Sequence, residues 1–307
     1  MPTVVPRECV RITTETVPGT YNSGGTVVLP RLIKDNAFTG IPEPMQYIIR
    51  TADASNRKAQ TGYGQVATKC KLSTPWYFSQ SATLIPLAIA VGSGPLVLPT
   101  CTIDHMTMLE DNSNTKIYTR YLGCTVANLN IACGNTPTSI YAMLDFDFDF
   151  MSVAAITVSD FPNQALGSYN TDLPVIFTQS AGAFSLHGAR TSYSMFSCKI
   201  ANINDVIYDE SIYPQAIKWC GRDISAAAEF RFKSLADRND FQALAKLTSQ
   251  IAFTDGTNTA TLNFETANYI NKADDNLALS KAHRQAVSFD SYLDYTAGLD
   301  FAYTQAP

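Results

Sequence analysis

The chain has 307 residues, of which 46% are hydrophobic and only 16% are charged. A charged share of about 25% is usual, so much of the surface must be neutral and polar. The formal charge of −5 argues against a protein that grips nucleic acid through its phosphates, which requires a basic surface. At roughly 150 residues per domain, the length indicates about two domains.

No apolar run reaches the ~18 residues that a membrane-spanning helix needs, so we expect no membrane partner. The N-terminal residues lack the apolar core of a signal peptide. Seven cysteines are an odd number, and they form no Cys-x-x-Cys pair. The sequence therefore indicates a reduced fold made in the cytoplasm, without a disulfide framework.

Residues 1–45 are rich in Thr, Pro and Gly and lack a clear period, which predicts an extended N-terminal arm. Short strands are expected near residues 26–29 and 47–50. Residues 79–91 have helical character, with Ser79 or Ser81 able to cap the helix. Pro86 is expected to bend or delay that helix, because proline lacks the N–H that a helix interior uses.

Alternating polar and apolar residues predict most of the remaining elements as strands. One hairpin is expected from the two strands that flank the polar segment 110–114. A second is expected at Asp255–Gly256, a dipeptide typical of tight hairpin turns. The clearest helix is Leu235–Leu247, with Ser234 as its cap. The predicted strands are 65–72, 101–109, 116–130, 139–150, 173–178, 193–204, 221–233, 250–254, 260–268 and one or two within 285–303.

The sequence contains an internal repeat. Cys124–Asn130 matches Cys198–Asn204 at four identical positions, and Asp145–Phe148 resembles Glu229–Phe232 further along. The order strand, helix, hairpin also occurs twice. These features predict a mainly β protein with two tandem β-sandwich or β-barrel domains, each flanked by one helix, because antiparallel sheets with one wet face show this alternation. The predicted boundaries are an arm at 1–45, a first domain at 46–155, a connector at 156–190 and a second domain at 191–307.

The usual catalytic and cofactor motifs are missing from the sequence. The three histidines are isolated, and there is no Gly-x-Ser-x-Gly elbow, Walker loop or dinucleotide-binding glycine pattern. Cys124 and Cys198 are expected to be small buried residues. We therefore predict a protein that is not an enzyme and has no cofactor and no metal site.

The candidate functional residues are charged side chains on two of the predicted strands. Asp145, Asp147 and Asp149 alternate along one strand, so their side chains line one face about 7 Å apart. That spacing favours a solvated strand face, a charged lining or a subunit seam over a calcium loop, which needs a turn. At the matching positions the second copy has one acidic and two basic residues, and each pair of opposite charges between neighbouring copies would favour assembly by ~0.2–1 kcal/mol. The second set is Glu229, Arg231 and Lys233.

The chain resembles the major tail tube proteins of long-tailed, siphovirus-like bacteriophages, in particular the class with two tandem tube domains. The residues that carry the resemblance are Tyr118–Leu129 with Leu144–Asp147, and in the second half Ile217–Ile224 with the strand-to-helix step Phe230–Leu247. The resemblance covers about residues 60–305. It is a pattern of strand order together with a few residues, and the N-terminal arm lies outside it.

The resemblance implies a structural virion protein of the phage tail, assembled in the host cytoplasm. Inner strands of neighbouring domains would join into one barrel, and a chain with two domains would form a trimeric ring with pseudo-sixfold symmetry. Stacked rings would form the conduit through which genomic DNA passes without specific binding. The N-terminal arm and the connector would join successive rings. The expected partners are other copies of the chain and the tape measure, tail terminator and distal tail proteins.

Three other functions stay open on the sequence. A tail terminator or distal tail ring protein of the same fold would form single rings instead of long stacks. A carbohydrate-binding β-sandwich would need exposed aromatic platforms, and the chain has only two Trp residues. An enzyme would need a constellation of reactive residues, which the sequence does not display.

Overall fold

The computed structural model confirms a mainly β protein with a small helix. It describes residues 8–30, 38–40, 43–50, 58–90, 96–108, 115–134, 141–157, 174–176, 184–186, 189–190, 193–231, 239, 242–243, 247–269, 274–276, 284–292 and 300–306. The first-half elements are β1 (Glu8–Thr14), β2 (Val27–Val28), β3 (Phe38–Gly40), β4 (Glu43–Arg50), β5 (Lys58–Ala67), β6 (Lys69–Pro75), α1 (Phe78–Leu84), the 3-10 helix η1 (Ile85–Ala88), β7 (Cys101–Met108), β8 (Lys116–Gly134), β9 (Met143–Asp149) and β10 (Ser152–Ala155).

In the described parts of the second half, the regular elements are strands, apart from three residues in a helical turn. Its elements are β11 (Phe184–Leu186), β12 (Ala189–Arg190), β13 (Tyr193–Ile207), β14 (Ala216–Arg231), β15 (Leu247–Thr254), β16 (Thr259–Tyr269), β17 (Asp274–Asn276), β18 (Arg284–Tyr292) and β19 (Phe301–Ala306). The predicted helix 235–247 lies mostly outside the described residues. Within it, Ala243 N donates to Asn239 O at 2.8 Å, the spacing of an α-helical bond.

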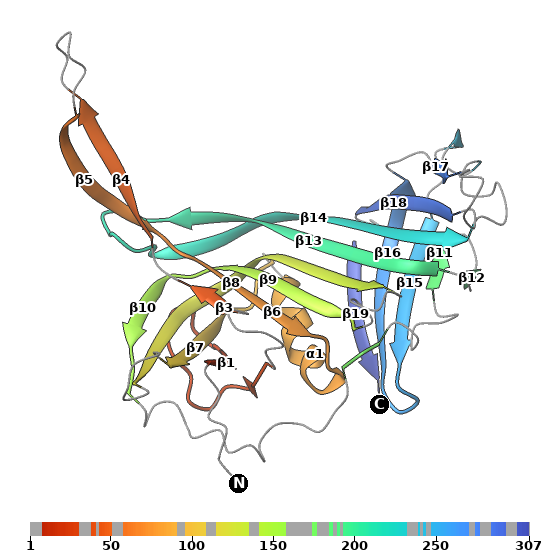
Figure 1. Ribbon diagram of the computed structural model, residues 1–307, viewed down its shortest axis with the longest axis horizontal. Coiled ribbons are helices and arrows are strands. Elements are labelled where there is room, and N and C mark those ends of the chain that lie inside the picture. The colour runs from red at the N-terminus through yellow and green to blue at the C-terminus, as the bar shows by residue number, and fades with distance from the viewer. Residues whose placement is uncertain are drawn as a thin grey trace.

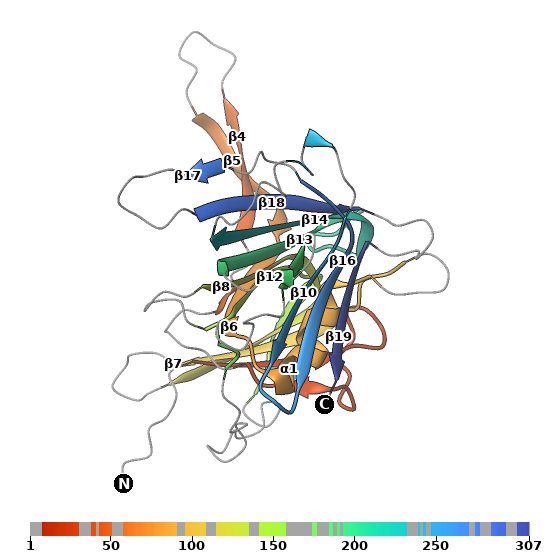
Figure 2. The ribbon, with the colours of Figure 1, turned by 90° about the vertical axis from the view of Figure 1, so that its right-hand side faces the viewer.

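One continuous antiparallel sheet, which we call the main sheet, runs through both halves (Figure 1). Its strand order follows from the pairings and is β3–β6–β9–β8–β13–β14–β18–β16. Beyond β3 and β6 the same two strands continue as β4 and β5, which form a separate two-stranded sheet. This hairpin projects away from the main sheet in both ribbon views (Figures 1 and 2).

The strand order repeats along the main sheet. A hairpin (β3/β4 with β5/β6), a helix (α1), a second hairpin (β7–β8) and a strand (β9) form a first unit. The second unit repeats this with β13–β14, the helical turn, β15–β16 and β18. In both units the last strand lies between the first hairpin and the second, as β6–β9–β8 and β14–β18–β16.

Strands β8 and β16 each belong to two layers. The N-terminal part of β8 pairs with β7, and its C-terminal part pairs with β9 and β13. The two parts meet at Gly123, which has a φ of 65°. A Cβ there would lie 2.6 Å from Met151 Sδ, so glycine alone fits this bend. Likewise, the N-terminal part of β16 pairs with β15 and β19, and its C-terminal part pairs with β18.

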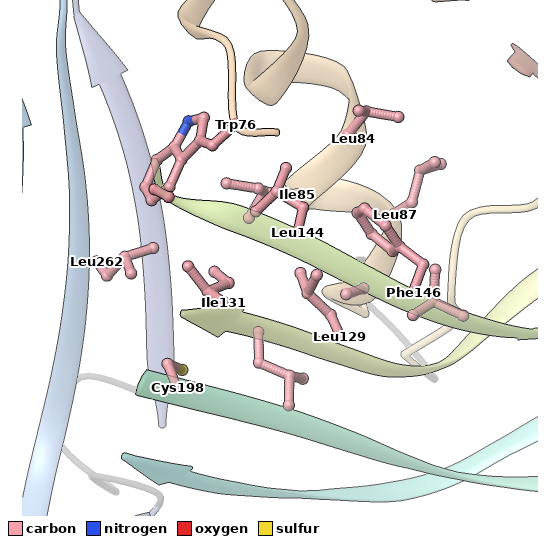
Figure 3. Close-up of a cluster of buried hydrophobic side chains, with 14 of the residues drawn as sticks. Trp76, Leu84, Ile85, Leu87, Leu129, Ile131, Leu144, Phe146, Cys198 and Leu262 are labelled. Atoms are coloured by element: carbon pink, nitrogen blue, oxygen red, sulfur yellow. The ribbon is translucent and has the colours of Figure 1, made fainter. Parts of the chain in front are cut away.

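The hydrophobic core lies between the main sheet and a second layer. That layer consists of β1, β7 and the N-terminal part of β8 in the first unit, and of β15, β19 and the N-terminal part of β16 in the second. Figure 3 shows α1 and η1 covering the core face of the sheet, with Leu84 and Ile85 above Leu129 and Leu144. The buried cluster is continuous across both units. Cys124 and Cys198 belong to it, so the prediction that both are small buried residues is confirmed.

Two parts of the sequence interpretation need correction. Residues 8–14 were expected in an extended N-terminal arm, but β1 pairs with β7 along its whole length and residues 9–13 are buried. The repeated heptads Cys124–Asn130 and Cys198–Asn204 lie on β8 and β13, which are adjacent and antiparallel. They are therefore not equivalent positions, since β8 corresponds to β16. The matching heptads therefore do not mark equivalent strands, whereas the repeated order of strand, helix and hairpin does.

Candidate assembly surface

The main sheet has a core face and an open face, because side chains alternate along each strand. On β9 the core face holds Leu144, Phe146 and Phe148. On β13 the side chains that point to the open face include Met195, Lys199 and Ile203, each of which is exposed. A shallow pocket of about 260 Å³ crosses this face, and small side chains dominate its lining: Asn130, Ile131, Ala132, Ser197, Cys198, Lys199, Ser225, Ala226, Ala227 and Ser288. The open face therefore mixes polar side chains with a few exposed apolar ones, and small side chains surround its shallow pocket.

The three predicted aspartates lie on the open face of β9, between β6 and β8. Asp147 pairs in register with Lys71 of β6, and the Lys71 Nζ to Asp147 Oδ1 distance is 3.5 Å. Asn128 of β8 donates to Asp147 from the other side at 3.3 Å. Asp145 accepts a hydrogen bond from Ser73 Oγ at 2.5 Å. These carboxylates thus have partners within the chain.

Asp149 is the most buried of the row. Burial raises the pKa of its carboxyl above the ordinary value, and the charge of Asp147 adds to this. A hydrogen bond from Asn204 Nδ2 at 3.1 Å and the charge of Lys69 act in the opposite direction. Asn204 comes from β13, so Asp149 joins the two units.

The second predicted set lies on β14 and does not meet the first within the chain, because β8 and β13 separate β14 from β9. Glu229 is opposite Met195 and Ala286, and Arg231 is opposite Arg284. Lys233 lies outside the described residues. In the second unit, β18 takes the place of β9, and its Ser288-Phe289-Asp290 alternates in the same way. The repeat in the sequence had matched Asp145–Phe148 with residues of β14 instead.

Two acidic residues of the open face, Asp223 and Asp290, were not among the predicted site residues. Burial raises the pKa of the Asp290 carboxyl, a bond from Tyr292 lowers it, and the like charge of Asp223 raises it. The alternation in 285–292 contained this signal. At the open-face positions of the main sheet, carboxylates and basic residues are nearly balanced, because Arg231 and Arg284 share the alternation of Glu229 and Asp290 on β14 and β18. The other charged residues at such positions include Asp145, Asp147, Asp149, Asp223, Lys69, Lys71 and Lys199.

The junction between the two units is fixed by a buried amide. Asn202 Nδ2 donates to Ala88 O at 3.2 Å and to Val126 O at 3.1 Å. Its Oδ1 accepts a bond from Trp219 Nε1 at 3.1 Å. One side chain therefore connects η1, β8 and β14.

The described residues include no group of three or more His, Cys, Asp or Glu side chains placed to hold a metal ion. Among the same residues, no helix is both long and apolar enough to cross a membrane. His105 lies 2.9 Å from Glu8 Oε1 and packs on Phe38, which is a structural role, and the other two histidines lie outside the described residues.

Comparison with known proteins agrees with this arrangement. A search of the curated proteins finds no match. The profile of a family described as phage tail tube protein matches residues 8–303, nearly the whole chain. The match includes both units of the main sheet and the projecting hairpin. The chain belongs to the family of phage tail tube proteins.

Proposed function

We propose that the chain closes into trimeric rings through the ends of its main sheet, and that stacked rings form the conduit for DNA ejection. Family membership supports the structural, non-enzymatic role in the virion. The observation that carries the finer proposal is the duplicated four-strand order in one continuous sheet. A sheet with two open ends exposes unpaired backbone groups, and ring closure removes them.

The strand directions favour a rotation between the units. Neighbouring strands of the main sheet are antiparallel, and equivalent strands such as β6 and β14 are four positions apart. An even offset makes equivalent strands run in the same direction, as a rotation about a tube axis requires. Three chains would then give six units around one ring. Tandem domains, with the proposed division at 156–190, are thus compatible with pseudo-sixfold symmetry.

The junction inside the chain is a template for the junction between chains. At the internal junction the C-terminal part of β8 pairs with β13, the first strand of the second unit. The equivalent junction would pair the C-terminal part of β16 with β3 of the next chain. In this junction four strands separate β14 from β9 of the next chain. The predicted pairing of opposite charges between the set Asp145, Asp147 and Asp149 and the set Glu229, Arg231 and Lys233 would therefore need a different contact between copies, and it stays a prediction. Reversing Arg231 and Lys233 to Glu should impair assembly and leave folding intact, and normal assembly would contradict it.

The open face is the proposed channel lining. Binding to DNA depends largely on neutralised phosphates, so an acidic chain whose open face has no excess of basic residues lets DNA slide without sticking. In a trimer the formal charge is 3 × −5 = −15 per ring. The projecting hairpin β4–β5 is a further proposed contact between rings, beside the connector and the part of the N-terminal arm outside β1. Proposed partners are the tape measure, tail terminator and distal tail proteins.

Negative-stain microscopy of the purified protein, alone and with the other tail components, tests the proposal. Rings or tubes with a central channel are the expected result. Long stacks would distinguish a tube protein from a tail terminator or distal tail protein, which forms single rings. Monomers under all these conditions would contradict ring closure.

A further inference from the structure

The first hairpins of the two units differ in length. In the first unit, β4 and β5 continue beyond the main sheet as the projecting hairpin. In the second unit, β13 and β14 end at the loop Tyr208–Gln215. Within the described part of the chain there is therefore one projecting hairpin, although the main sheet has two units (Figure 1).

The short hairpin contacts the base of the long one at Val66. Val66 N donates to Ile212 O at 3.0 Å, and Tyr208 Oη donates to Val66 O at 2.9 Å. On β4 the residue opposite Val66 is Pro44, which has no N–H to donate. The backbone of Val66 is thus bound by the loop of the second unit, and its side chain is 9% exposed.

The loop itself is a compact turn. Ser211 N donates to Tyr208 O at 2.9 Å, and Gln215 N donates to Ile207 O at 2.7 Å. Asp209 has a φ of 44°, in the left-handed region that Asp tolerates better than most residues. A tight turn of this kind provides a firm support for the hairpin that rests on it.

We propose that the loop Tyr208–Gln215 is a buttress that fixes the direction of the projecting hairpin, so that the hairpin meets a second copy of the chain in the adjoining ring. A two-stranded hairpin is only marginally stable alone, so its direction needs such support. The inference rests on the proposed stacking of rings. Its consequence is that a trimeric ring presents three hairpins and not six, so stacked rings fit at threefold positions.

Hydrogen exchange measured by mass spectrometry on the unassembled full chain tests the buttress. Tyr208→Phe removes the hydroxyl that binds Val66 O and keeps the ring. We expect exchange over residues 43–67 to become about three- to tenfold faster, as for the loss of one hydrogen bond. Tyr213→Phe is the matched control, because Tyr213 is held within the loop by its backbone N–H, which donates to Ser211 Oγ.

Electron microscopy of the same variants separates this inference from ring closure. Tyr208→Phe should form rings as readily as the wild type but shorter stacks, and Tyr208→Ala should shorten them further. Failure of the wild type to form rings would count against the proposed function. Where rings form normally, two results would overturn the buttress. One is hydrogen exchange over residues 43–67 of Tyr208→Phe that stays within twofold of the wild type. The other is faster exchange in Tyr208→Phe together with stacks of wild-type length.

Discussion

The two units of the main sheet share a strand order but differ in what is buried around them. In the first unit, Arg11, Asp104 and Arg120 lie in register across β1, β7 and β8. Asp104 is fully buried and binds both arginines, and the Arg120 guanidinium lies 3.7 Å from the ring centroid of Tyr21. This unit combines an apolar core with a buried ionic row.

The second unit is built around aromatic rings. Phe264 packs against Phe289 and Phe301 with centroid distances of 5.3 Å, and its ring lies edge-on to both. An ion pair, Arg222 with Asp300, lies at the edge of this region. The comparison teaches that strand pairing defines the duplicated fold, while quite different side chains stabilise each copy.

Removing the shared carboxylate of the ionic row is expected to have the largest effect. Asp104→Ala leaves two buried guanidinium groups without their common partner, which should lower the free energy of unfolding by about 3–5 kcal/mol. Denaturant unfolding followed by circular dichroism measures this. Asp205→Ala, at an exposed position of β13, is the control. A loss below about 1 kcal/mol at Asp104 would mean that the first unit does not depend on the row.

Removing the ring of Phe264 tests how far the second unit depends on its aromatic cluster. Phe264→Ala removes a fully buried ring that contacts three other rings, at a cost of about 3–5 kcal/mol. Raising the ionic strength should leave this loss unchanged, since no charge is involved. A loss that varies strongly with salt would contradict an apolar origin.

The junction between the units should respond less strongly. Asn202→Ala leaves Ala88 O, Val126 O and Trp219 Nε1 without a bond that each makes in the folded chain. The expected loss is about 1–3 kcal/mol. Thermal unfolding with separate probes shows whether the two units still unfold together. An unchanged melting temperature would show that Asn202 does not fix the junction.

The smallest expected effect is at Asp149. Because its pKa is raised in the folded protein, the neutral form is favoured, and stability falls as pH rises through that pKa. Asp149→Asn removes this cost and still accepts the bond from Asn204. The melting temperature at neutral pH should rise by about 1–2 °C, and the gain should vanish near pH 4. A lower melting temperature at neutral pH would contradict burial as the dominant cause.

Local elements were predictable from the sequence, and long-range order was not. Strict alternation gave β9, and Pro86 correctly marked a break, since α1 ends at Leu84 and Pro86 lies in η1. The Asp255–Gly256 turn joins β15 and β16 as expected. By contrast, β1 was missed although Val10 and Ile12 alternate with Arg11 and Thr13, because its pairing with β7 leaves no pattern in the local sequence.

The candidate site was predicted only in part, because it too depends on pairing between strands that are distant in sequence. The alternating aspartates identified the open face of β9, but their partners Lys71 and Ser73 come from a strand some 70 residues away in sequence. Pairing between distant strands has no local pattern, so the sequence could not show that β9 matches β18. The second charged set was therefore assigned to β14.

Cryo-electron microscopy of assembled tubes tests the central claim most directly, because it counts the chains in each ring. We expect three chains per ring, and three main sheets of eight strands each give 3 × 8 = 24 strands around the channel. The open face, with Asp147 and Asp290, should line that channel. A ring of six chains, or a channel lined by other strands, would contradict it.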